Sequence, residues 1–143
     1  MTTTSATNQA AYQRLHDATN RRDLELISRT VDEVFHPDAV FHVRGPVGAT
    51  APEAVKGAWA MLRRVFPDIQ VTIEDTITEG DKIVFRTTVT GTHQGEYRGL
   101  AATGKTITYD EMFIIRFSEG RVAEVWGIVD VFSQLQQLGV QIP

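Results

Sequence analysis

Residues 107–129 read ITYDEMFIIRFSEGRVAEVWGIV, and this stretch decides the fold. β-Branched and aromatic residues dominate 107–117 and 122–129, and the turn signal Ser118-Glu119-Gly120 between them is typical of a β-hairpin. Residues 71–90 repeat the pattern around Glu79-Gly80-Asp81. The late part of the chain is therefore predicted to form consecutive antiparallel strands.

The rest of the chain shows helical periodicity. Apolar residues recur at helical spacing in four stretches: residues 12–18, 24–34, 55–66 and 132–138. Asp23 and Asp130 stand where N-caps belong, and Thr50-Ala51-Pro52-Glu53 has the form of a capping box. Pro67 and Gly139 are placed to end the third and fourth helices. Helices are therefore predicted before the strands, and a short helix after them.

Helices early and strands late predict an α+β fold. We expect a cone-shaped, strongly curved antiparallel sheet, packed against three helices of the N-terminal half, with a short C-terminal helix. Such curvature leaves a cavity at the wide end of the cone. The length of 143 residues with 42% hydrophobic residues indicates one domain. We expect it to cover residues 9–143, after a flexible tail at residues 1–8.

Composition excludes several classes of partner and site. The net charge is -4 and the basic residues are scattered, which argues against nucleic-acid and membrane-surface partners. The chain has no cysteine, hence no disulfide and no thiolate site. Its four histidines stand on separate elements without metal-ligand spacing, so no metal is expected. The polar start resembles neither a signal peptide nor an anchor, and a cytoplasmic location is expected.

The connection from Gly91 to Lys105 combines several glycines with His93 and Tyr97. Glycine permits backbone angles that other residues resist, so such a loop can shape the mouth of a pocket while its polar side chains face a ligand. The alternative is an ordinary glycine-rich connection in which His93 ties the loop to neighbouring backbone.

An ordered series of short motifs resembles the SnoaL-like polyketide cyclase family, often labelled ester cyclase. These motifs are Phe66-Pro67-Asp68, Glu79-Gly80-Asp81, Gly91-Thr92-His93, Ala102-Thr103-Gly104-Lys105, Arg116 to Trp126 and Gln136-Gln137-Leu138-Gly139. The resemblance implies the fold of the nuclear transport factor 2 (NTF2) superfamily, an apolar pocket, and homodimers or higher homo-oligomers. It also implies an apolar small-molecule substrate and ring closure by an intramolecular aldol reaction without cofactor or metal.

The chain departs from this family at the position of its acid-base residue. In the resembling cyclases an Asp immediately follows the position of Trp126, and here that position is Gly127. The common His before the Trp is replaced by Val125. The pocket wall is therefore expected to be apolar and roomier, and the usual catalytic group is missing.

Three residues are candidates for the missing acid-base function: Glu111, His42 and His93. Strand alternation places Glu111 on one face with Tyr109 and Phe113, and a carboxylate in an apolar strand is costly to bury without a partner or a task. The alternative for Glu111 is an exposed strand residue paired with Arg86 or Arg116. His42 is expected to point into the cavity, as its counterpart often does in the family, or else to be a hydrogen-bonded core residue.

We expect the substrate to lie against apolar and aromatic side chains, of which many also serve simply as core. The candidates are Trp59, Phe66, Tyr97, Leu100, Tyr109, Phe113, Val125 and Gly127.

Three functions are open. The first is a cofactor-independent enzyme that acts on a polyketide-like or other apolar carbonyl compound by acid-base chemistry. The second uses the same pocket for hydroxylation or for epoxide hydrolysis. The third is a small-molecule-binding protein without catalysis, whose affinity would survive the loss of Glu111 and His42.

Overall fold

The computed structural model describes residues 4–42 and 49–141, and these form four helices and a five-stranded sheet. In chain order the elements are α1 (Thr4–Arg21), α2 (Leu24–Val34), β1 (Phe35–His42), α3 (Ala51–Val65), β2 (Gln70–Glu79), β3 (Lys82–Thr92), β4 (Thr106–Ser118), β5 (Arg121–Val129) and α4 (Val131–Gln137). Helix α1 begins inside the stretch that was expected to be a flexible tail.

The predicted N-terminal caps of α2, α3 and α4 are confirmed. Asp23 caps α2 by accepting from two backbone N–H groups, and Asp130 caps α4 by accepting from Ser133 N at 3.0 Å. Thr50 and Glu53 form the complete capping box of α3. Each cap satisfies amide groups that the first turn of a helix leaves without a partner.

The sheet has the order β1-β5-β4-β3-β2 and is mixed. Strands β2 to β5 are antiparallel, as predicted, but β1 lies parallel to β5 at the edge, and the sheet does not close into a barrel. The register of β1 shifts between Phe35 and Val40, around Pro37. Because proline is tolerated on edge strands and at bulges, this segment pairs despite lacking a simple strand pattern.

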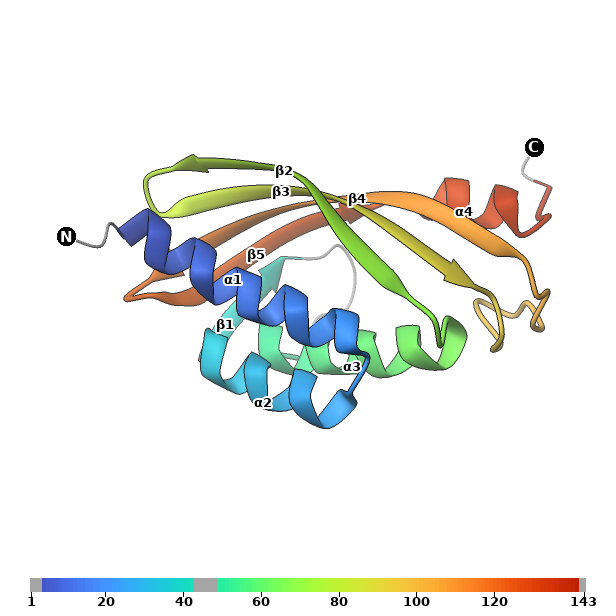
Figure 1. Cartoon of the computed structure of the whole chain (residues 1–143), viewed down its shortest axis with the longest axis horizontal. Coiled ribbons are helices and arrows are strands. Elements are labelled where there is room, and N and C mark those ends of the chain that lie inside the picture. The colour runs from blue at the N-terminus through green and yellow to red at the C-terminus, as the bar shows by residue number, and fades with distance from the viewer. Residues whose placement is uncertain (1–3, 43–48, 142–143) are drawn as a thin grey trace.

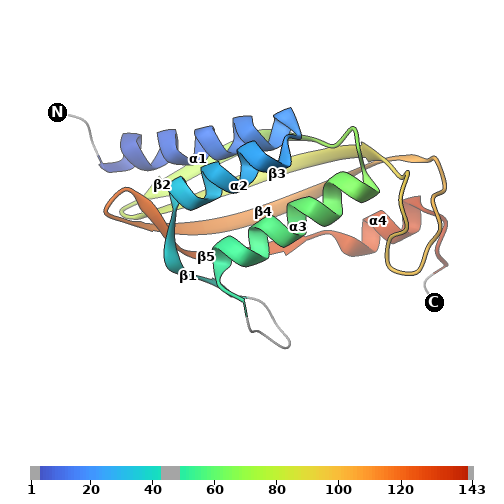
Figure 2. The same cartoon turned by 90° about the horizontal axis from the view of Figure 1, so that it is seen from below.

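The sheet arches over α1, α2 and α3, which lie together on its concave face (Figures 1 and 2). Side chains that face these helices form two apolar clusters, one around Ile83, Phe85 and Ile115, and one around Phe66 and Tyr109. On the convex face the alternate residues of β4 and β5 are exposed, including Met112, Ile114 and Ile128. This is an α+β fold of the NTF2 type.

Candidate functional site

Glu111 lies on the concave face of the sheet, between the two apolar clusters. It stands on β4 between Tyr109, which belongs to one cluster, and Phe113, which packs against the other. Its pairing partners are Thr87 on β3 and Val129 on β5. The strand parity expected from the sequence is thus confirmed, because no bulge interrupts the pairing of β3 with β4.

The carboxyl group of Glu111 is desolvated and receives one hydrogen bond from a neutral donor, the Thr87 hydroxyl, at 3.1 Å from Oε1. Burial raises the pKa of Glu111 to about 7, although the Thr87 hydrogen bond opposes this. The alternative ion pairs are not formed, since Arg86 binds Asp75 and Arg116 binds Glu124 on the other face. Glu111 is therefore poised to exchange a proton near neutral pH.

Two phenol groups lie near this carboxyl: that of Tyr109, a predicted binding residue, and that of Tyr12, which sequence reasoning missed. Burial and then the negative charge of Glu111 raise the pKa of Tyr12 and of Tyr109. The Tyr97 hydroxyl donates to Gln134 Oε1 at 2.6 Å, and Gln134 also hydrogen-bonds Tyr109. Tyr12 sits on the apolar stripe of α1, and only the packing of that helix on the sheet, where Tyr12 stacks on Phe85 of β3, reveals its proximity to Glu111.

The surroundings of Glu111 are not sealed from solvent. Tyr12, Phe113 and Val129 are only partly buried although they face the interior, whereas Ile83 and Val89 on the same face of the neighbouring strand are fully buried. Side chains around Glu111 are therefore more exposed to solvent than those at Ile83 or Val89.

Gly127 pairs with Phe113 on the concave face, so the apolar surface expected at this position is present. The extra space expected from the lack of a side chain at Gly127 is not. A Cβ placed on Gly127 would lie 2.2 Å from Cδ1 of the Phe113 ring, so the ring already fills the space of a side chain at that position. Val125 is buried beside it. The Phe113 ring therefore fills the space that the acidic side chain of other family members would need at position 127.

His42 does not reach this site, contrary to expectation. It pairs with Trp126 and stacks on it on the convex face, with ring centroids 4.7 Å apart. Its Nε2 lies 2.7 Å from Glu124 Oε2, and Arg116 holds the other oxygen of that carboxylate. The prediction of a cavity-facing His42 is wrong because Phe41, the neighbouring position, packs inward instead.

His93 is fully buried at the start of the loop that follows β3. Its Nδ1 accepts from the backbone N–H of Thr103 at 3.2 Å and lies 2.9 Å from the Thr103 hydroxyl. In a neutral ring this leaves the proton on Nε2, and Nε2 has no hydrogen-bond partner in the described part of the chain. The structural role expected for His93 is present, together with an unused donor.

The loop is held against the end of α3. Gln94 N donates to Val65 O at 2.8 Å, and a Cβ on Gly95 would lie 2.5 Å from the Arg64 carbonyl oxygen, so only glycine allows this approach. Gly99 has a φ of +84° in the turn between Tyr97 and Leu100. The glycines therefore fix the loop against the core instead of leaving it open.

The remaining predicted binding residues divide between core and site. Phe66 is buried at the centre of one cluster and its ring contacts those of His93, Tyr97 and Tyr109. Leu100 packs against the same cluster, and Trp59 packs against both clusters while staying partly exposed. Trp59 is thus placed near the boundary at which Glu111 lies.

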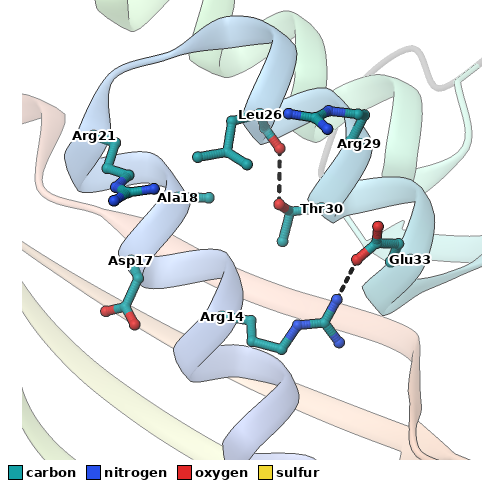
Figure 3. Close-up of a pocket in the computed structure, with 8 residues that line it drawn as sticks. All are labelled: Arg14, Asp17, Ala18, Arg21, Leu26, Arg29, Thr30 and Glu33. Atoms are coloured by element: carbon teal, nitrogen blue, oxygen red, sulfur yellow. Dashed lines mark hydrogen bonds and ion pairs between the residues drawn. The ribbon is translucent and has the colours of Figure 1, made fainter.

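A groove of about 570 Å³ lies elsewhere, between α1 and α2 (Figure 3). Its charged side chains include Arg14, which pairs with Glu33 across the groove, and none of the predicted site residues lines it. Exposed ion pairs of this kind carry little energy. We therefore place the candidate site at Glu111.

Residues 4–42 and 49–141 contain no group of three or more histidine or acidic side chains arranged to hold a metal ion. None of the helices in these ranges is both long and apolar enough to cross a membrane.

Comparisons with known proteins agree with the motifs. The model of the SnoaL-like polyketide cyclase family matches residues 9–138. IdmH of Streptomyces antibioticus, a proposed polyketide cyclase, is 32% identical, with 93% of this chain and 99% of that chain covered and a TM-score of 0.77. No curated protein matches the sequence significantly.

Two further Streptomyces structures are similar over almost the whole chain. AclR of Streptomyces galilaeus, a proposed hydroxylase, is 29% identical, with 96% of this chain and 85% of that chain covered and a TM-score of 0.81. TsrD of Streptomyces laurentii is 26% identical, with coverages of 95% and 97% and a TM-score of 0.83. On the family match and the fold, this chain belongs to the SnoaL-like polyketide cyclase family.

Proposed function

We propose that this protein is a cofactor-independent enzyme in which Glu111 transfers a proton to and from a carbon next to a carbonyl group of an apolar, polyketide-like substrate. The observation that carries the proposal is the placement of Glu111: within residues 4–42 and 49–141 its desolvated carboxyl, with a pKa of about 7, is hydrogen-bonded only by Thr87 and is flanked by aromatic side chains. A base whose pKa lies near the working pH is most effective in proton transfer.

The reaction follows from the groups present. The Glu111 carboxylate takes a proton from the carbon, which leaves an enolate and a neutral carboxylic acid. Phenol groups such as those of Tyr12 and Tyr109 are suited to donate hydrogen bonds to the enolate oxygen. In a cyclisation the enolate carbon attacks a second carbonyl of the same molecule, and the resulting alkoxide takes the proton back from Glu111.

His93 enters the proposal as a buried binding group at the end of β3. Its free Nε2–H is a donor suited to a carbonyl oxygen, and an unpaired buried donor costs about 1–3 kcal/mol until an acceptor arrives. Thr87 lies in β3 and His93 directly follows this strand, and strand alternation places both on the concave face. They stand six positions apart, about 20 Å in extended backbone. His93 would therefore hold a part of the substrate remote from the reacting carbon.

The test uses 2-tetralone, a bicyclic aromatic ketone, and follows incorporation of solvent deuterium next to its carbonyl by NMR. We expect the wild type to accelerate the exchange and Glu111→Gln to lower this acceleration by about 10²- to 10⁴-fold. Glu124→Gln is the matched control on the convex face and should leave the rate unchanged. An equal effect of both substitutions, or no acceleration by the wild type, would refute the proposal.

Hydroxylation is a second candidate. It is favoured by Gly127, which stands at the position of the family's acid-base Asp, and by similarity to the proposed hydroxylase AclR. Isotope labelling separates the two reactions, because oxygen from ¹⁸O₂ enters the product of a hydroxylase and does not enter that of a cyclase. A binding protein without catalysis would retain its affinity for 2-tetralone in Glu111→Gln and show no turnover in the wild type.

We also propose that a second copy of the chain covers the convex face of the sheet. Met112, Ile114 and Ile128 lie side by side there, and Ile128 is 77% exposed. Charged side chains such as Arg86 and Asp110 border this apolar strip, as in a homodimer interface with an apolar centre and a polar rim. Light scattering on the purified protein tests the oligomeric state.

A further inference from the structure

Phe113 and Gly127 form a complementary pair beside Glu111. They pair directly across β4 and β5, and atoms Cδ1 and Cε1 of the ring lie 2.2 and 2.3 Å from the position that a Cβ on Gly127 would take. Real side-chain contacts do not become this short, so the ring occupies space that exists only because residue 127 lacks a side chain. The orientation of Phe113 depends on Gly127.

The cross-strand rows of the sheet show why this orientation matters. Phe85, Phe113 and Gly127 form one row on the concave face, and Thr87, Glu111 and Val129 form the next. Phe85 is already stacked with Tyr12 at 3.6 Å between ring centroids. The Phe113 ring therefore has crowded neighbours on the Phe85 side and leans towards β5, over the glycine.

We propose that Phe113 is a specificity-determining residue of the site and that Gly127 is its positioning residue: the ring, seated over the glycine, forms the wall that limits the width of a flat substrate beside Glu111. The inference rests on the proposed function of Glu111. Phe113, Tyr12 and Trp59 are all partly exposed and aromatic, so the ligand class they fit is a planar conjugated ring that bears a ketone.

The test compares two ketones of different width, 2-tetralone and 2-tetralone with a tert-butyl group on its aromatic ring. The readout is kcat/KM for solvent-deuterium exchange next to the carbonyl. Phe113→Ala should shift the preference towards the wider ketone by about tenfold or more, since a few methyl groups in an apolar pocket have effects of this size. Phe113→Leu should shift it in the same direction by less, and keeps the packing if the alanine variant does not fold.

The positioning role has its own readout. Gly127→Ala should displace the Phe113 ring from residue 127 towards Glu111 and lower kcat/KM for both ketones by about tenfold. The double variant Phe113→Ala/Gly127→Ala should recover the activity and the preference of Phe113→Ala, which a merely structural defect at residue 127 would not allow.

The possible outcomes separate this inference from the proposed function. If both ketones respond equally to Phe113→Ala and Phe113→Leu, or if the double variant is no better than Gly127→Ala, the inference is wrong even while Glu111→Gln still abolishes exchange. If the wild type accelerates exchange of neither ketone, the proposed function fails and the inference fails with it.

Discussion

Two glutamates on neighbouring strands behave in opposite ways because they lie on opposite faces of the sheet. Glu111 on the concave face has one neutral hydrogen-bond donor and a raised pKa, of about 7. Glu124 on the convex face accepts from Arg116 and then from His42, and these hydrogen bonds hold its pKa below the usual range. The comparison shows that partners and solvation, rather than residue type, separate a structural carboxylate from a chemical one.

The largest expected effect on this comparison comes from Glu111→Gln and the free energy of unfolding. Below pH 4.5 the glutamate is protonated in both folded and unfolded chains, so the substitution should change little. Between pH 4.5 and 7 only the unfolded chain loses the proton, and the wild type loses stability as the pH rises. At pH 8 the variant should therefore be more stable than the wild type by about 3 kcal/mol.

Urea unfolding at pH 4 and at pH 8 measures this difference. Glu124→Gln is the control and should show the reverse sign, since its carboxylate is stabilised in the folded state. Parallel pH dependence of the wild type and Glu111→Gln would mean that Glu111 is solvated.

A second prediction concerns the convex face. Ile128→Lys places a charge in the exposed apolar strip and should weaken self-association by about tenfold or more. Sedimentation over a concentration series measures this change, with Thr72→Lys, on the same face of the edge strand β2 and farther from the strip, as the control. A wild type that is monomeric at all concentrations would contradict the proposed dimer.

A smaller effect is expected from Thr87→Val. Valine has nearly the same shape as threonine but cannot donate the hydrogen bond that the Thr87 hydroxyl makes to the Glu111 carboxyl. That hydrogen bond lowers the pKa of Glu111, so its loss should raise the pKa further above about 7. NMR titration with ¹³C-labelled glutamate follows both carboxyls at once. An unchanged titration of Glu111 would show that Thr87 is not its partner in solution.

The smallest effect is expected from His42→Ala. The imidazole is partly exposed and its pairing with Glu124 lies at the surface, so the loss of stability should be about 1 kcal/mol or less. Deuterium exchange of 2-tetralone should be unaffected. A large loss of exchange would place His42 in the chemistry and would contradict the separation of the two faces.

Much of the fold could be read from local signals. The caps at Asp23, Thr50 and Asp130, the hairpin turn at Glu119-Gly120 and the alternation around Glu111 each depend on residues close in sequence. Such signals act locally, so they survive in any tertiary context that keeps the element. Strand β1 was not predicted, because Pro37 and a register shift interrupt its alternating pattern and because its pairing partner β5 is far away in the sequence.

The candidate site was predictable only in part. Strand parity identified Glu111 and its neighbours Tyr109 and Phe113, but nothing local shows that Tyr12 of α1 and Thr87 of β3 lie beside the same carboxyl. The sequence did not show whether Phe41 or His42 faces inward. The pairing of β1 with β5 turns Phe41 inward and His42 outward.

The sequence by itself determined the α+β class, the N-terminal caps of α2, α3 and α4, the antiparallel strands β2 to β5 and the presence of a carboxylate on an apolar strand face, because these follow from propensity, capping and periodicity. The tertiary structure alone decided that Glu111 is desolvated, that His42 is not near it, and that the Phe113 ring fills the space over Gly127. These properties depend on distances between segments far apart in the chain, and side-chain packing sets those distances.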